Sequence, residues 1–232
     1  MESKKIAWTS AGTITMIIAL AIAIVMLLSI TYALHITRFN AIANEPTVKA
    51  RNIVLSSILK KPSLFDFVVF QNNTQPGSPL WMLRVCGIPG DTVEIRNGNL
   101  WVNNRRADSL LTLSHSYLIH SRDTLGMNIS ANAAVPILNA DSVKTDSIMI
   151  TYADKLVSLK PGLLHRYLLP ETIPDSYIQK QFQQPWNIDH FGPIAVPEHA
   201  YFLLGDNRSN AMDSRYFGFV REKDFKGTAL NF

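Results

Sequence analysis

The side chains that could support nucleophilic catalysis are serines close to lysines. Ser56 and Ser57 lie just ahead of Lys60 and Lys61 in the sequence. A serine needs an adjacent base, and a lysine serves as one only where burial and neighbours lower its pKa by several units. The Ser56–Lys60 spacing would place both on one face of a helix, but the short apolar run at 53–55 is typical of a strand. Exposed lysines also stay protonated near neutral pH, so a nucleophile here, or at Ser209, is only our alternative interpretation.

Two other segments combine turn-forming and charged residues. Residues 205–218 read Gly-Asp-Asn-Arg-Ser-Asn-Ala-Met-Asp-Ser-Arg-Tyr-Phe-Gly, and residues 84–93 read Arg-Val-Cys-Gly-Ile-Pro-Gly-Asp-Thr-Val. Their glycines and prolines predict tight turns that other residues would strain. Asn97-Gly98, shortly after the second segment, is a strong hairpin signal.

In this order, the segments resemble the signature boxes of the bacterial type I signal peptidases. Residues 205–218 resemble the last box and 84–103 the middle box. Residues 66–70 resemble the strand before it, with Phe65 in place of a glycine, and 45–48 resemble the stretch that follows the nucleophile. The resemblance implies an antiparallel all-β core with a variable insertion. It also implies a serine endopeptidase that removes signal peptides from exported preproteins with a Ser–Lys dyad.

The reactive positions of that family hold inert side chains in this chain. The resemblance places the nucleophile at Ala43, the general base at Leu83, the serine that orients this base at Ala211, and an oxyanion-hole hydroxyl at Ala41. None of these side chains donates, accepts or carries a proton. Loss of one oxyanion donor alone typically costs about 100-fold to 1000-fold in rate. We predict no intact catalytic residue and a loss of proteolytic activity.

The other motif residues are expected to form the peptide groove or to support it. In the family the aspartates and arginines are largely structural, and the groove binds extended peptide by strand addition. The residues at these positions are Pro46, Thr47, Arg84, Gly87, Pro89, Gly90, Asp91, Gly205, Asp206, Asn207, Arg208, Asp213, Ser214 and Arg215.

These observations predict a pseudoenzyme that serves as a binding or assembly subunit in the cell envelope. Its expected partners are the lipid bilayer and another envelope protein or an exported preprotein. One alternative is an active signal peptidase that uses an unconventional nucleophile. Another is an inactive relative that regulates an active peptidase.

The N-terminal part of the chain is strongly apolar. Residues 6–34 contain no acidic, basic or histidine side chain, and about 20 apolar residues suffice to cross a bilayer. We predict a cytoplasmic tail at 1–5 and a single transmembrane signal anchor at 6–36. Lys4 and Lys5 favour a cytoplasmic N-terminus, which would leave the bulk of the chain on the extracytoplasmic side of the cytoplasmic (inner) membrane.

Composition excludes several other classes. The net charge is +4, but the basic residues are scattered, so we expect at most mild attraction to anionic lipid head groups and no nucleic-acid binding. The single cysteine, Cys86, excludes an internal disulfide. The sequence contains no metal-binding or nucleotide-binding motif, so we expect no metal and no cofactor.

Short apolar runs between turns predict the strands of the all-β core. We assign the core to residues 37–104 and 194–232 and the variable insertion to 105–193. The expected strands are 53–55, 67–70, 80–85, 92–95, 100–102 and 201–204, with 148–152 in the insertion, where 172–184 is polar enough for helix or loop.

Overall fold

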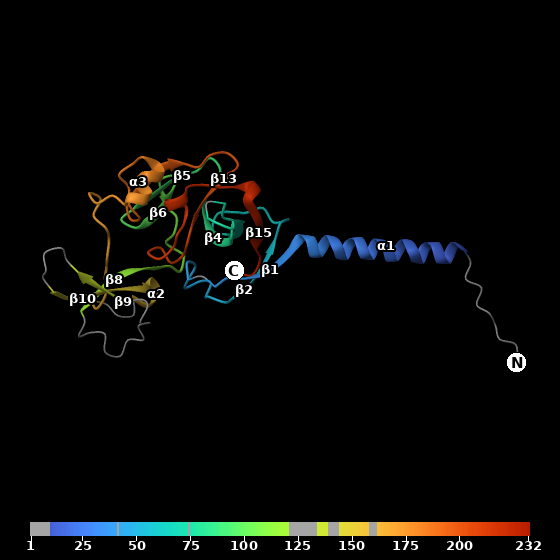
Figure 1. The fold of residues 1–232 in the computed structure, drawn as a ribbon, viewed down its shortest axis with the longest axis horizontal. Helices are drawn as coiled ribbons and strands as arrows, with labels where there is room; N and C mark the ends of the chain where they lie inside the picture. Colours follow the sequence, from blue (N-terminus) through green and yellow to red (C-terminus); the bar gives the residue numbers. More distant parts are fainter. Residues whose placement is uncertain (1–9, 41, 74, 121–133, 139–143, 158–161) are drawn as a thin grey trace.

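The computed structural model describes residues 10–40, 42–73, 75–120, 134–138, 144–157 and 162–232 (Figure 1). The predicted tail at 1–5 lies outside the described residues. Most of the fold is built from antiparallel strands in three sheets. The expectation of an antiparallel, mostly β fold is therefore confirmed.

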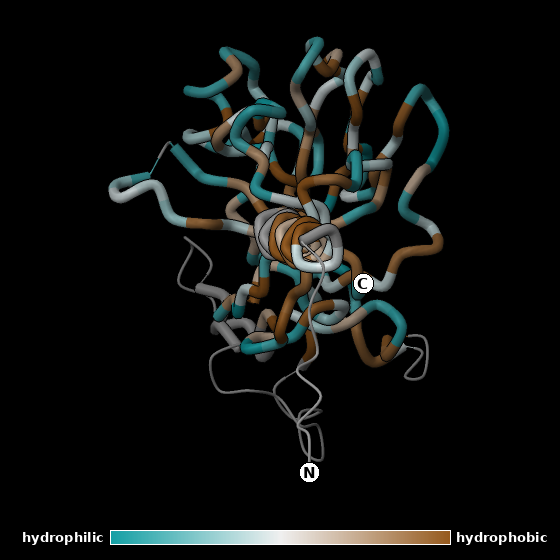
Figure 2. Tube along the Cα trace, turned by 90° about the vertical axis from the view of Figure 1, so that its right-hand side faces the viewer, coloured by the Kyte–Doolittle hydropathy of each residue, from teal (hydrophilic) through white to brown (hydrophobic). Residues whose placement is uncertain are grey.

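The helix α1 (Ser10–Ala33) points away from the sheets and continues directly into strand β1 (Leu34–Arg38) (Figure 1). Figure 2 views this helix end on and shows its apolar colouring. The helix ends at Ala33, before the predicted end at residue 36, because the chain continues as a strand from Leu34. Within the described part of the chain, no helix has the length and apolarity needed to cross a membrane, and the predicted transmembrane segment is not supported.

The largest sheet has seven strands and carries the motifs. Its order is β1 (Leu34–Arg38), β2 (Ile53–Ser57), β15 (Phe225–Ala229), β3 (Phe67–Gln71), β4 (Leu80–Gly87), β13 (Ala200–Leu204) and β14 (Val220–Arg221). Phe67, Val68, Val69 and Phe70 of β3 are all buried, so this strand runs through the interior. The helix α4 (Ser214–Phe217) and the 3₁₀ turn at Glu222–Asp224 connect its last strands.

A second sheet packs beside the first. Its order is β12 (Phe191–Ala195), β5 (Thr92–Arg96), β6 (Asn99–Val102) and β7 (Arg105–Arg106). Asn97 and Gly98 both have positive φ, at 48° and 69°, as the turn predicted between β5 and β6 requires. Strand β7 lies inside the predicted insertion and β12 crosses its end at 193, so this sheet includes part of the insertion. The buried Ile178 of α3 (Ser176–Phe182) packs in the same core cluster.

The rest of the insertion forms a third sheet at the end of the molecule opposite α1 (Figure 1). Its order is β11 (His165–Arg166), β8 (Ser114–His120), β10 (Lys144–Ala153) and β9 (Ala134–Leu138), with the short helix α2 (Asp154–Val157) after β10. The strand expected at 148–152 lies within β10. This sheet reaches the core at Ser114, whose backbone N–H donates to Asp206 O at 3.0 Å.

Candidate functional site

A buried ion pair joins the two main motifs. Arg84 on β4 donates from Nε and NH2 to both carboxylate oxygens of Asp206, each at 2.6 Å. Its NH1 also donates to Phe65 O at 2.7 Å, and its guanidinium lies 4.0 Å from the centre of the Phe67 ring. Such a bidentate pair fixes geometry as well as charge. It holds the loop after β13 against the middle of the large sheet.

A second buried pair closes the other end of that loop. Arg215 donates from Nε and NH2 to Asp213 at 2.8 and 2.7 Å, and its NH2 also donates to Arg208 O at 2.6 Å. Burial disfavours the charged guanidinium, but the neighbouring Asp213 outweighs it, so the pKa of Arg215 is raised. Ser214 Oγ accepts from Leu203 N at 2.9 Å and attaches the segment to β13.

The remaining motif residues lie around these pairs. Arg208 pairs with buried Asp108 at 3.0 Å. Asn207 N donates to Ala43 O at 3.0 Å, and Thr47 Oγ1 donates to Thr112 O at 3.2 Å, beside Pro46. Gly87 is the last residue of β4, and Pro89, Gly90 and Asp91 form the turn between β4 and β5; none of the four lines the main pocket, whose lining is given below.

Three of the four predicted reaction positions come together. A Cβ on Gly205 would lie only 2.4 Å from both the Ala211 Cβ and the Ala43 carbonyl oxygen. Ala43 also packs against the core cluster that contains Leu83. Leu83 is 1% exposed and Ala211 6% exposed. Ala41 lies outside the described residues.

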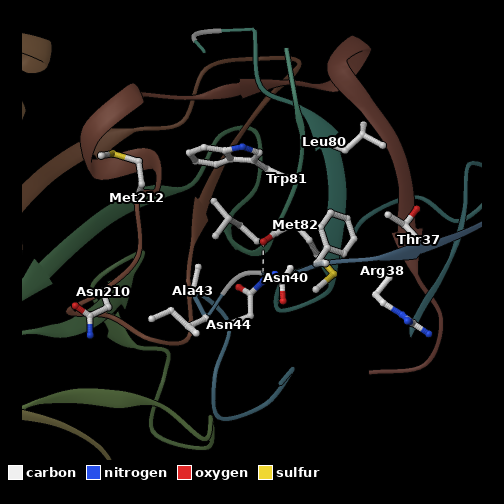
Figure 3. Close-up of a pocket in the computed structure, with 13 residues that line it drawn as sticks. Thr37, Arg38, Asn40, Ala43, Asn44, Leu80, Trp81, Met82, Asn210 and Met212 are labelled. Carbon is white, nitrogen blue, oxygen red and sulfur yellow. Dashed lines mark hydrogen bonds between the residues drawn. The ribbon is translucent and has the colours of Figure 1, made fainter. Parts of the chain in front are cut away.

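Ala43 and Leu83 line a pocket of about 630 Å³ between β4 and the segment around Ala43, and the neighbours of Ala211 in the chain, Asn210 and Met212, also line it (Figure 3). The lining consists of Thr37, Arg38, Phe39, Asn40, Ile42, Ala43, Asn44, Leu80, Trp81, Met82, Leu83, Asn210 and Met212. Among these described residues, Arg38 is the only charged side chain and Thr37 the only hydroxyl. The lining therefore offers an apolar groove with a few amides and no serine–lysine pair.

The serines and lysines of our alternative interpretation lie elsewhere. Ser56 is fully buried on β2 and its Oγ contacts His35 O at 3.5 Å, while Ser57 Oγ accepts from Leu59 N at 3.2 Å. Lys60 pairs with Asp66 at 2.9 Å. Ser209 Oγ accepts from Ser116 N at 2.8 Å. Each is engaged in a structural contact, and none lines the pocket.

One wall of the pocket is a strand edge that no other strand covers. β13 pairs with β4 only from Arg84 to Gly87, whereas β3 pairs along β4 from Leu80 to Arg84. In the described part of the chain, the Leu80–Leu83 half of β4 has no strand partner on its second side. Such an edge presents unpaired backbone groups that an added strand can use.

Asn44 is a site residue that the sequence analysis missed. It is 4% exposed, lines the pocket, and donates from Nδ2 to Met82 O at 2.7 Å on the open edge of β4 (Figure 3). Its Oδ1 is buried and has no hydrogen-bond partner among the described residues. The only signal in the sequence was an amide directly after Ala43, which by itself points to no particular contact.

No cluster of metal-ligating side chains is found in the described part of the chain. No group of three or more histidine, cysteine, aspartate or glutamate side chains comes together there.

Comparisons with known proteins agree with the motif order. The family described as "Signal peptidase, peptidase S26" matches residues 10–231. Signal peptidase I of Buchnera aphidicola subsp. Acyrthosiphon pisum is 28% identical over 74% of this chain and 54% of that protein. Signal peptidase I S of Bacillus subtilis is 29% identical over 64% of this chain and 49% of that protein. The chain thus spans about half the length of these curated relatives.

Among solved structures, a signal peptidase I from Enterococcus faecalis aligns with a TM-score of 0.36 and 23% identity, covering 73% of this chain and 97% of that one. The family match extends over nearly all of the chain, from α1 to the last strand. This chain belongs to the signal peptidase S26 family.

Proposed function

We propose that the chain binds an extended peptide in the groove beside β4 and does not cleave it by Ser–Lys chemistry. The observation that carries this proposal is the lining of the pocket around Ala43 and Leu83, which contains neither a serine nor a lysine among its described residues. A serine protease needs both, together with hydrogen-bond donors placed for the oxyanion.

The buried Leu83 fits a site without this chemistry. A lysine at a position that is 1% exposed would need partners to offset the loss of hydration. Ala43 and Ala211, two positions where the family carries hydroxyls, provide no polar side-chain atom. An apolar side chain of similar volume removes that cost. The three substitutions are therefore mutually consistent.

The groove keeps what peptide binding requires. The open half of β4 supplies backbone groups for strand addition, and Trp81, Leu80 and Met212 supply apolar contacts. Strand addition needs no catalytic dyad. The ligand class is an exported preprotein or a segment of another envelope protein, which makes this chain a binding or assembly subunit.

We also propose that α1 associates with a lipid bilayer. Its apolar side chains from Ile14 to Leu27 are largely exposed, and such a contiguous apolar surface is typical of a membrane or protein contact. Flotation of the purified chain with liposomes tests this. Co-flotation that is lost in a Leu20→Asp/Val25→Asp variant is expected, and a chain that stays in the dense fraction would contradict it.

The main experiment is preprotein cleavage by the purified chain in detergent, beside an active signal peptidase. The natural chain is expected to give no product. Correct cleavage by the natural chain would overturn the proposal and return attention to Ser56, Ser57 and Ser209.

An Ala43→Ser/Leu83→Lys/Ala211→Ser variant forms a third arm. Cleavage by this variant alone would show that the groove binds a substrate in register. Crosslinking of the natural chain in its own membrane tests the binding role directly: if it recovers neither a preprotein nor a constant partner, the proposed role as a subunit fails.

A further inference from the structure

The open edge of β4 is already engaged at one point by a side chain. Asn44 Nδ2 donates to Met82 O at 2.7 Å, across the gap that an added strand would enter. The neighbouring backbone holds Asn44 in place, because its carbonyl accepts from Val48 N at 2.9 Å and the Ala43 carbonyl accepts from Asn207 N at 3.0 Å. The carboxamide thus forms one rung on the edge of the sheet, as a backbone amide would.

The other end of this carboxamide lacks a partner. Asn44 Oδ1 is buried, and no described residue donates a hydrogen bond to it. Nearly all buried polar side-chain atoms in proteins have a hydrogen-bond partner, so each exception calls for an explanation. Here the acceptor belongs to a residue that lines a groove of about 630 Å³, which is within the usual range for binding pockets.

Building on the proposed peptide binding, we infer that Asn44 selects the ligand by accepting a hydrogen bond from one of its backbone N–H groups. The carboxamide links the ligand to β4, because it donates to Met82 and accepts from the peptide. A peptide with proline at the matching position has no N–H to donate. That position therefore discriminates against proline, while Trp81 and Met212 provide the apolar contacts beside it.

A neutral amide also suits this place better than a charged side chain would. Arg38 is the one charged residue of the described lining, and it is exposed. An acidic residue at position 44 would bury a carboxylate against the carbonyl oxygen of Met82, which is unfavourable. A leucine would fill a similar volume but provide neither the donor nor the acceptor.

The test combines peptide N-methylation with substitution at Asn44. The probe is a fluorescent nonapeptide of alanine, leucine and serine, compared with a series that carries one N-methyl group at each position in turn. For the natural chain, methylation at the matching position is expected to weaken binding by roughly threefold to tenfold, the effect of one hydrogen bond. In the Asn44→Leu chain, methylation at that position is expected to leave the affinity unchanged. Methylation at the other positions is expected to change the affinity as it does for the natural chain.

The control is Asn73→Leu, the same chemical change at an exposed residue outside the pocket lining. It is expected to leave the whole methylation pattern unchanged. Thermal unfolding of each variant confirms that it folds, and Asn44→Ala provides a second variant if Asn44→Leu does not.

The outcomes separate this inference from the proposed function. If the natural chain binds the peptide but no position loses its methylation effect in the Asn44 variants, the role of Asn44 is refuted and peptide binding stands. If the natural chain binds neither the nonapeptide nor any of a panel of signal-peptide sequences, the proposed function fails, and the inference fails with it.

Discussion

Leu83 and Arg84 are neighbours in β4, yet one is surrounded by apolar side chains while the other forms a bidentate ion pair with Asp206. Adjacent residues of a strand point to opposite faces. The face that holds Leu83 is apolar, while the face that holds the loop in place carries the charged pair. The ion pair that positions the loop therefore makes no use of the side chain at position 83.

Removing Arg84 is expected to destabilise the fold strongly. Arg84→Met leaves Asp206 buried and uncompensated, which costs about 3–5 kcal/mol. The measurement is urea unfolding at neutral pH. The matched control, Lys60→Met, removes a partly exposed pair with Asp66 and is expected to cost less than about 1 kcal/mol. Equal effects of the two substitutions would contradict this account.

Gly205→Ala is expected to disrupt the packing between the loop after β13 and the segment around Ala43. The new Cβ would lie 2.4 Å from the Ala43 carbonyl oxygen and from the Ala211 Cβ, and neither contact can be relieved by a flexible side chain. We expect a loss of about 2 kcal/mol or more. Gly90→Ala serves as the control, because nothing lies within 4 Å of its added Cβ, although its φ of 87° adds strain, with an expected cost of about 1 kcal/mol. A stable Gly205→Ala chain would show that the loop can move.

His115 is expected to make stability fall in mild acid. It is 4% exposed, and burial lowers its pKa below the usual 6.5, although the Asp154 carboxylate at 2.8 Å opposes the shift. Tyr117, Arg166 and Arg208 are its other titratable neighbours. Because the folded state resists protonation, this contribution is fully present above about pH 6.5 and is lost as the pH falls toward the lower folded pKa.

The measurement is the unfolding midpoint between about pH 7.5 and pH 5.5, with an expected shallower slope for His115→Gln. His199→Asn is the control, since that imidazole is exposed and its φ of 59° suits asparagine. A His115→Gln chain with an unchanged slope would assign the acid sensitivity to other groups.

Local patterns in the sequence predicted those parts of the fold that depend on neighbours along the chain. Asn97-Gly98 predicted a hairpin because its turn needs positive φ at both residues, and the structure has it. The short apolar runs between turns predicted β3, β4 and β13, because a buried strand consists of a short continuous run of apolar residues. The prediction for the N-terminal segment was less successful, because hydropathy did not reveal that the chain turns into strand β1 at Leu34.

Contacts between residues far apart in the sequence could not be predicted from such local patterns. Asn44 meets Met82 across 38 positions, and nothing near Asn44 in the sequence indicates a strand edge there. His115 contacts Asp154 across 39 positions, and no local pattern in the sequence indicates this contact either. β12 pairs with β5 although it begins inside the predicted insertion. The motif order located Ala43, Leu83 and Ala211, but their proximity depends on the packing of Gly205.

Cys86 is expected to be unreactive in the folded chain. Burial raises the pKa of its thiol to about 12, against the opposing influence of Arg208 and Arg84. The thiolate is the reactive form. The rate of maleimide labelling at neutral pH is therefore expected to depend on how often the chain unfolds and not on the concentration of the reagent. The check is labelling over a urea series, compared with unfolding measured by circular dichroism. Rapid labelling without denaturant would show that this part of β4 opens locally.

Leu83→Lys is expected to create a buried amine whose cost depends on pH. With no partner at Ala43 or Ala211, the folded state disfavours the ammonium, so the pKa of the new lysine falls below its usual value of about 10.4. The variant is then destabilised by about 3 kcal/mol or more at neutral pH, and the loss shrinks as the pH approaches 10, where the unfolded lysine also becomes neutral.

Thermal unfolding at both pH values measures this loss of stability, with Leu83→Met as the control for shape. Adding Ala211→Ser restores the hydroxyl at the position where the family carries the serine that orients this base, and is expected to recover part of the loss at neutral pH. A Leu83→Lys chain as stable as Leu83→Met at both pH values would mean that the groove is wet enough to hydrate an ammonium, and the physical argument for the missing dyad would then fail.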